Sequence, residues 1–133
     1  MDDSIGMKSQ EAIGLLDDIE LFVKSPGIPY VDLVKRAIEK KIPVVDEIEV
    51  SFMELKKNSS HTKIIAVTGT NGKTTTTAKT AELLSFAGYK STACGNIGKP
   101  FGEVVLDGIE YDYIVIELSS FQLENLINFK SDI

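Results

Sequence analysis

The segment TGTNGKTT occupies residues 68–75, between the apolar stretch KIIAVT (63–68) and a helical pattern over 74–87. A strand, a glycine-containing loop and a helix in this order allow backbone N–H groups and the helix N-terminus to surround phosphate groups. Gly69 and Gly72 permit the loop to curl. Lys73 brings a positive charge to the outer phosphates, and the Thr74 hydroxyl suits Mg²⁺. We predict that ATP with Mg²⁺ binds to Gly69, Thr70, Asn71, Gly72, Lys73, Thr74 and Thr75.

This loop departs from the commonest phosphate-binding pattern at one position. The pattern G-x-x-x-x-G-K-[ST] begins with a glycine where this chain has Val67. The alternative interpretation is a glycine-rich β–α turn that binds nothing. However, the helix begins with four threonines, residues 74–77, which are poor helix formers. A functional reason for these residues is therefore favoured over an ordinary turn.

A carboxylate follows another buried strand. Glu117 lies near the end of DYIVIEL (112–118), an apolar run typical of a strand that is covered on both faces. A carboxylate at this place, beside a phosphate loop, can hold Mg²⁺ directly or through water. The alternative is a surface glutamate at a strand end. We take Lys73 and Glu117 as the candidate catalytic residues, and Thr74 and Glu117 as the candidate metal ligands.

Two polar segments accompany Glu117. GNIGKP (95–100) follows the predicted strand YKSTAC (89–94) and contains Asn96, while ELSSFQLE (117–124) contains Ser119, Ser120 and Gln122. In an open parallel sheet, ligands bind outside the carboxyl ends of the strands. We therefore expect the phosphate loop and both polar segments to meet at one edge of a parallel sheet.

The rest of the chain shows the alternation of strands and helices of an α/β protein. Before the polar linker KKNSSHT (56–62), we expect a strand at 19–24, the turn SPGIP (25–29), a helix at 30–40, a strand at 42–45 and a helix within 46–55. After it, Asp-Gly within VVLDGIEY (104–111) predicts a hairpin turn, and 120–128 predicts a helix. We place two domains at 1–57 and 58–133.

Composition excludes several classes of function. The chain of 133 residues has a net charge of −6, which argues against nucleic acid as a partner. Its single cysteine, Cys94, forms no internal disulfide and is expected to be a buried small hydrophobic residue. His61 lies in the polar linker, and one histidine with one cysteine argues against a zinc site. No apolar run is long enough to insert into a membrane, so a cytoplasmic location is expected.

Five segments together resemble the Mur ligase family, and within it the branch that adds D-glutamate. They are TGTNGKTT, which matches the family's phosphate loop including its missing first glycine, GNIG, ELSSFQLE, SPGIP and DEIEV (46–50), in the family's order. The resemblance covers residues 20–133. It implies a fold with parallel sheets and helices on both faces: part of an N-terminal Rossmann-like domain, followed by the first half of a P-loop ATPase-like central domain.

The resemblance also implies an activity. Members of this branch use ATP and Mg²⁺ to join D-glutamate to UDP-N-acetylmuramoyl-L-alanine through an acyl phosphate, in peptidoglycan synthesis in the cytoplasm. By position, Lys73 holds the phosphates, Thr74 and Glu117 serve Mg²⁺, and Asn96, Ser119 and Gln122 contact the UDP-linked substrate. The chain resembles an internal fragment of the enzyme, which we expect to be inactive alone. The alternatives are a non-catalytic ATP-binding module and a folylpolyglutamate-type ligase, against which ELSSFQLE argues.

Overall fold

The computed structural model describes residues 7–59 and 61–133 as an α/β protein with two parallel sheets. The first sheet pairs β1 (Phe22–Val23) with β2 (Val44–Val45), and the second has the strand order β3-β5-β4. Its strands are β3 (Lys63–Val67), β4 (Ser91–Gly95) and β5 (Tyr113–Glu117). All pairings between these strands are parallel, as the alternating pattern of strands and helices predicted.

The N-terminal unit is small. Helix α1 (Ser9–Gly14), which the sequence did not predict, packs against α2 (Asp32–Glu39). The two strands are shorter than predicted, because only residues 22–23 and 44–45 pair with one another. Between β1 and α2 lies the predicted SPGIP turn, where Gly27 has a φ of 76°. The unit contacts the rest of the chain at Tyr30, whose hydroxyl donates to Asn125 Oδ1 at 3.0 Å.

Helix α3 (Glu47–Asn58) connects the two sheets and belongs physically to the second. Asp46 caps it by accepting hydrogen bonds from the backbone N–H groups of Ile48, at 2.9 Å, and Glu49, at 3.2 Å. The apolar face of α3 joins the core of the second sheet through Ile48, Phe52 and Leu55. The domain boundary between residues 57 and 58 stays a prediction; it falls in the last turn of α3, a helix that packs against the second sheet.

The segment between β4 and β5 differs from the predicted hairpin. In place of a hairpin there is a helix, α5 (Phe101–Leu106), whose Phe101 and Val104 are buried three residues apart, as on one helical face. Asp107 and Gly108 end this helix: Gly108 has a φ of 71°, and Asp107 Oδ1 accepts from Ile109 N at 2.9 Å. A hairpin was the wrong prediction because β4 and β5 are parallel and need a crossover connection.

Helix α6 (Ser120–Leu123) is shorter than the predicted 120–128. The residues after it leave the helical path because their backbone N–H groups turn toward the buried Glu49 carboxylate. Its oxygens accept from Ile127 N at 3.0 Å, Asn128 N at 2.8 Å and Phe129 N at 3.0 Å. The chain then runs along the free edge of β3, where Asp132 N donates to Ile64 O at 2.8 Å and Ala66 N donates to Ile133 O at 3.0 Å.

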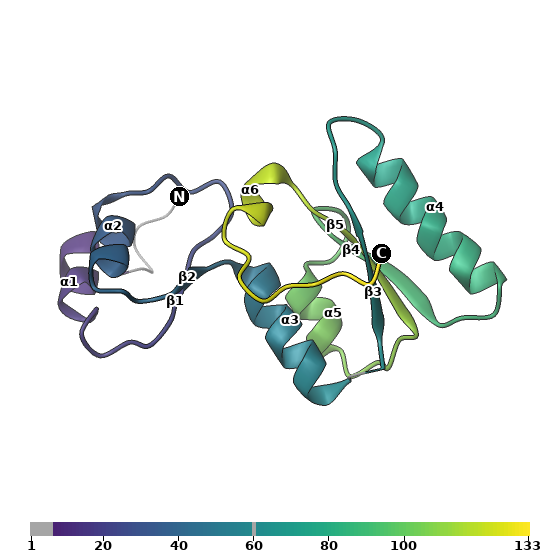
Figure 1. Cartoon of the computed structure of the whole chain (residues 1–133), viewed down its shortest axis with the longest axis horizontal. Coiled ribbons are helices and arrows are strands. Elements are labelled where there is room, and N and C mark those ends of the chain that lie inside the picture. Colours follow the sequence, from purple (N-terminus) through teal and green to yellow (C-terminus); the bar gives the residue numbers. More distant parts are fainter. Residues whose placement is uncertain (1–6, 60) are drawn as a thin grey trace.

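The second sheet is covered on both faces (Figure 1). Helix α4 (Lys73–Phe86) lies on one face, and α3 and α5 lie on the other. The buried core lies between the sheet and the α3–α5 pair, and Ile64, Cys94, Ile114 and Ile116 belong to it. The predicted α/β class with helices on both faces of a parallel sheet is therefore confirmed. Within residues 7–59 and 61–133, no helix has the length and hydropathy needed to cross a membrane.

Candidate functional site

The three predicted segments meet at one edge of the second sheet, as expected. In the parallel register, Val67 at the end of β3 and Gly95 at the end of β4 both lie opposite Glu117 at the end of β5. The phosphate loop follows Val67, the GNIGKP segment begins at Gly95, and ELSSFQLE begins at Glu117. The last residues of the three strands therefore lie side by side. This edge brings the candidate nucleotide, metal and substrate residues together.

The phosphate loop has the conformation that its glycines allow. Gly69 and Gly72 have φ values of 136° and 75°, which side-chain-bearing residues rarely adopt. Helix α4 begins directly afterwards at Lys73, and no side chain caps its N-terminus. Thr74 and Thr75 lie exposed in its first turn. The open N-terminus offers backbone N–H groups and the positive end of a 14-residue helix to an anion.

Lys73 folds back onto its own loop. Its Nζ donates to the carbonyl oxygen of Gly69 at 2.9 Å. A carbonyl is a weaker partner for an ammonium group than a phosphate oxygen, because a phosphate carries full negative charge. The lysine is therefore held over the loop and can exchange this carbonyl for the phosphates of a nucleotide.

Glu117 is the buried carboxylate of the edge, with an exposed fraction of 2%. Its Oε1 accepts a hydrogen bond from Asn96 Nδ2 at 3.1 Å, whereas its Oε2 is buried and has no partner among the described residues. A buried carboxylate oxygen without a partner costs free energy, and a cation would remove that cost. The surroundings of Glu117 therefore fit a divalent cation.

A complete protein-only metal site is not present in the part of the chain that the structure describes. No group of three or more His, Cys, Asp or Glu side chains lies close enough together there to hold an ion. Mg²⁺ in nucleotide sites keeps several water molecules and binds one or two protein ligands together with phosphates. Thr74 and Glu117 stay the predicted ligands.

Ser119 and Gln122 form the N-terminal cap of α6. The Ser119 hydroxyl accepts from Gln122 N at 3.4 Å, and Gln122 Oε1 accepts from Ser119 N at 2.9 Å. This reciprocal arrangement is a capping box, and it fixes both side chains beside Glu117. The S-x-x-Q spacing signals this structural role, which was not among the predictions, and the binding of a ligand by these residues stays a prediction.

The remaining residues singled out from the sequence lie outside this edge. Cys94 is fully buried in the core, and this burial, followed by the nearby charge of Glu47, raises the pKa of its thiol to about 12. Its burial confirms the prediction of a buried small hydrophobic residue. His61 is exposed next to the start of β3, at the opposite end of the strand from the phosphate loop.

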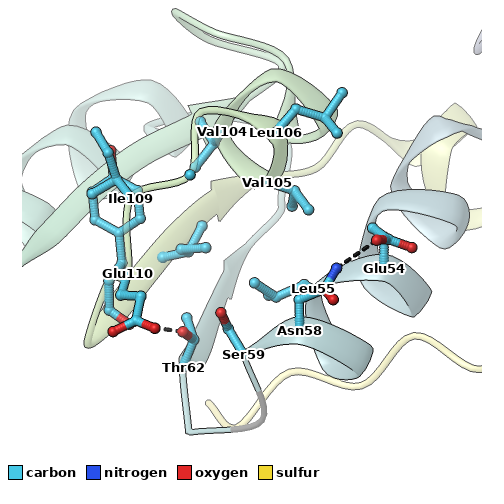
Figure 2. A pocket seen from close by; sticks show the side chains of 13 residues that line it. Glu54, Leu55, Asn58, Ser59, Thr62, Val104, Val105, Leu106, Ile109 and Glu110 are labelled. Carbon is cyan, nitrogen blue, oxygen red and sulfur yellow. Dashed lines mark hydrogen bonds between the residues drawn. The ribbon is translucent and has the colours of Figure 1, made fainter.

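A pocket of about 340 Å³ lies at the opposite end of the sheet, between the C-terminal ends of α3 and α5 (Figure 2). Leu55 and Val104 contribute apolar surface to the pocket, and the carboxylates Glu54 and Glu110 also line it. None of the residues predicted to bind ATP, metal or substrate lines this pocket. It is therefore separate from the edge that carries Glu117.

Comparisons with known proteins agree with the geometry. Residues 67–132 match the model of the Mur ligase middle domain. The chain is 52% identical over 130 residues, 98% of its length, to the UDP-N-acetylmuramoylalanine–D-glutamate ligase of Fusobacterium nucleatum. It is 46% identical over 121 residues to the ligase of that name from Streptococcus sanguinis, and 38% identical over 127 residues to that from Natranaerobius thermophilus. These matches cover 90% and 93% of the chain.

The chain spans only part of each relative: 30% of the Fusobacterium protein, 26% of the Streptococcus protein and 28% of the Natranaerobius protein. A solved structure, the UDP-N-acetylmuramate:L-alanyl-gamma-D-glutamyl-meso-diaminopimelate ligase from Neisseria meningitides, aligns with 83% of this chain and 38% of its own at 21% identity, with a TM-score of 0.46. The middle-domain match begins at Val67, the last residue of β3, and includes the phosphate loop, β4 and β5, while the identity extends over nearly the whole chain. This chain belongs to the Mur ligase family.

Proposed function

We propose that this chain forms part of an ATP-dependent amide ligase that adds D-glutamate to UDP-N-acetylmuramoyl-L-alanine, a step of peptidoglycan precursor synthesis. The observation that carries the proposal is the buried Glu117 carboxylate, in register with the strand that leads into the phosphate loop; one of its oxygens has no partner among residues 7–59 and 61–133. The names of the relatives, which span the same residues at 38% to 52% identity, supply the substrates.

The chemistry proceeds in two displacements. A carboxylate oxygen of the muramoyl-alanine substrate attacks the γ-phosphorus of ATP, and the bond from that phosphorus to ADP breaks, which gives an acyl phosphate. The amine of D-glutamate then attacks the acyl carbon, loses a proton, and expels inorganic phosphate. The protein's contribution is to position these groups and to neutralise the charge of the transferring phosphoryl group.

Each residue of the edge has a proposed part in these steps. Lys73 and the N-terminus of α4 hold the ATP phosphates, with the loop residues 69–75. Glu117 and Thr74 hold Mg²⁺, which supplies positive charge beside the phosphates when it is bound. In this role Glu117 uses Oε2, which has no hydrogen-bond partner in the part of the chain that the structure describes.

The UDP-linked substrate is proposed to contact Asn96, Ser119 and Gln122. Ser119 Oγ and Gln122 Oε1 already accept hydrogen bonds within the cap of α6. The Ser119 hydroxyl hydrogen and the Gln122 amide hydrogens therefore remain as donors. Donors at these positions suit the phosphate and carboxylate oxygens of that substrate. We place the reaction in the cytoplasm, where ATP and nucleotide-linked precursors occur, with no nucleic-acid or membrane-inserted partner.

A chimeric enzyme tests the proposal. These 133 residues replace the matching segment of the Fusobacterium nucleatum ligase, to which they are 52% identical over 130 residues. We expect the chimera to form the D-glutamate product from UDP-N-acetylmuramoyl-L-alanine and Mg-ATP, and to lose this activity with Lys73→Ala. A chimera that folds and binds ATP but ligates nothing would contradict the proposal and favour a non-catalytic ATP-binding module.

A further inference from the structure

Asn96 is bonded twice to Glu117. Its backbone N–H donates to the Glu117 carbonyl oxygen at 3.0 Å, and its side-chain Nδ2 donates to the Glu117 carboxylate Oε1 at 3.1 Å. The first bond fixes the backbone of Asn96 beside the end of β5, and the second uses that fixed position to hold the carboxylate. Two bonds between the same two residues restrain the carboxylate more tightly than the side-chain bond alone.

This contact sets the direction of the other carboxylate oxygen. A carboxylate is planar, so holding Oε1 also fixes where Oε2 lies. Oε2 is buried and has no partner among the described residues, in a side chain with an exposed fraction of 2%. The Asn96 bond therefore leaves Oε2, which no described residue pairs with, for a ligand.

The close approach of β4 to β5 makes the contact possible. Gly95, immediately before Asn96, has a φ of 99°, and a Cβ built on it would lie 2.4 Å from the Glu117 carbonyl oxygen and 2.9 Å from Ile116 Cγ1. Only glycine leaves the room that Asn96 needs to reach over the end of β5. The contact between Asn96 and Glu117 therefore depends on two consecutive residues, Gly95 and Asn96.

We propose that Asn96 is a positioning residue for the metal of Mg-ATP: it holds Glu117 Oε1 so that Oε2 faces the cation. This inference rests on the proposed function, which assigned Asn96 to the substrate. The two roles are compatible, because Nδ2 serves Glu117 and Oδ1 is left to accept from the substrate. Asn96 then links the metal side of the edge to the substrate side.

The experiment measures how much Mg²⁺ tightens ATP binding to the 133-residue chain. Calorimetry gives the affinity for ATP in excess Mg²⁺ and in EDTA, and the ratio of the two affinities is the metal-dependent gain. We expect Asn96→Ala to lower this ratio about tenfold, the loss expected for one hydrogen bond to a charged group, with the affinity in EDTA unchanged within about twofold. A merely structural defect would lower both affinities together.

Three further variants sharpen the result. In the Glu117→Gln background, Asn96→Ala should cause no additional loss, because the two residues act as a unit. Lys99→Met is the control on the same segment, since the Lys99 side chain is 58% exposed and pairs with Glu103. Asn96→Leu keeps the size of the side chain without its N–H, and it decides the question if the alanine variant does not fold, as judged by thermal melting.

An unchanged ratio in Asn96→Ala, or a full additional loss in the Glu117→Gln background, would overturn the inference. Equal ATP binding by the wild-type chain in Mg²⁺ and in EDTA would also overturn it, while leaving the phosphate loop intact. Absence of ATP binding in both buffers would instead reject the proposed phosphate site, and this inference with it.

Discussion

At the scale of single residues, the site depends on glycines, which have no side chain, as much as on residues with functional side chains. Gly95 and Gly98 both have positive φ values, 99° and 61°, and lie in the same segment. They differ in their surroundings: a Cβ on Gly95 would collide with β5, whereas a Cβ on Gly98 would meet nothing within 4 Å. The two glycines therefore separate the cost of backbone strain from the cost of a steric clash.

We predict that Gly95→Ala lowers the free energy of unfolding by about 3 kcal/mol, because backbone strain adds to overpacking against the Glu117 carbonyl. Gly98→Ala, the matched control, should cost about 1 kcal/mol from strain alone. Urea denaturation of both variants measures the difference. Equal losses in the two variants would show that the close approach of β4 to β5 does not matter for stability.

Lys73 is the only positively charged side chain within the loop 68–75. We predict that Lys73→Ala weakens the binding of Mg-ATP at least tenfold, roughly the value of one charge-assisted hydrogen bond to phosphate. Lys79→Ala is the control, because Lys79 lies on the same helix, is 67% exposed and pairs with Glu82. Calorimetry compares the two. An undiminished affinity for Mg-ATP in Lys73→Ala would show that the loop is not part of the nucleotide site.

At the scale of elements, Glu49 of α3 holds the segment that follows α6. Besides the three backbone N–H groups of residues 127–129, its carboxylate accepts from Asn128 Nδ2 at 2.9 Å, and the side chain is fully buried. Glu49→Gln replaces one acceptor oxygen by an N–H₂ group that faces donors. We predict a loss of about 3 kcal/mol in the free energy of unfolding, measured in urea.

The control for Glu49→Gln is Glu124→Gln, since Glu124 is an exposed residue at the C-terminal end of α6. Its replacement should change the free energy of unfolding by less than about 0.5 kcal/mol. If Glu49→Gln were equally harmless, the segment 127–129 would not depend on the buried carboxylate.

The same carboxylate predicts a dependence on pH. Burial by itself raises the pKa of Glu49, but the hydrogen bonds from Ile127, Asn128 and Phe129 together outweigh it and lower the pKa below the ordinary 4.5. The unfolded chain then binds the proton more readily than the folded chain. The stability that Glu49 contributes is therefore present above pH 4.5 and is lost as the pH falls through the lowered pKa.

Unfolding free energies of the wild type and of Glu49→Gln, measured between about pH 3 and pH 7, should converge as the pH falls. The difference in unfolding free energy between the two proteins separates the contribution of Glu49 from that of the other carboxyl groups, such as Asp46, whose pKa is raised by burial. A constant difference across the range would contradict the lowered pKa.

These elements also show what the sequence could and could not predict. Apolar runs ending in Thr68, Cys94 and Leu118 located the three strands, and the parallel pattern then placed Glu117 beside the phosphate loop. Helix α5 was missed because Asp-Gly is an equally good signal for a helix end and for a hairpin. The bonds of Glu49 to residues 127–129 were not predictable, because they join positions 78 to 80 residues apart and no local pattern records such a contact.

At the scale of the whole molecule, the described residues contain the proposed phosphate site. The chain spans 30% of the Fusobacterium relative, and no cluster of three metal-ligating side chains occurs in residues 7–59 or 61–133. Ligation requires ATP, metal and two further substrates in one geometry, and a misplacement of about 1 Å costs on the order of 100-fold. Weak binding of ATP is compatible with this arrangement, because the loop and α4 are complete.

We therefore predict that the 133-residue chain alone releases phosphate from Mg-ATP, in the presence of UDP-N-acetylmuramoyl-L-alanine and D-glutamate, at least about 100-fold more slowly than the Fusobacterium nucleatum ligase in the same assay. The ligase is the positive control, and the chain without D-glutamate is the blank. Turnover that depends on D-glutamate and approaches that of the relative would contradict the prediction.

The strand order β3-β5-β4 has a consequence for biosynthesis. Both outer strands pair with β5 and not with each other, and β5 is the last of the three to leave the ribosome. Translation proceeds at roughly 5–20 residues per second, so the 45 positions from Val67 to Asp112 take some seconds to appear. Until β5 appears, β3 and then β4 lack the strand with which they pair, and the phosphate loop emerges seconds before the strand that carries Glu117. The nascent polypeptide therefore exposes the unpaired edges of β3 and β4 to chaperones and to other chains until its central strand has been synthesised.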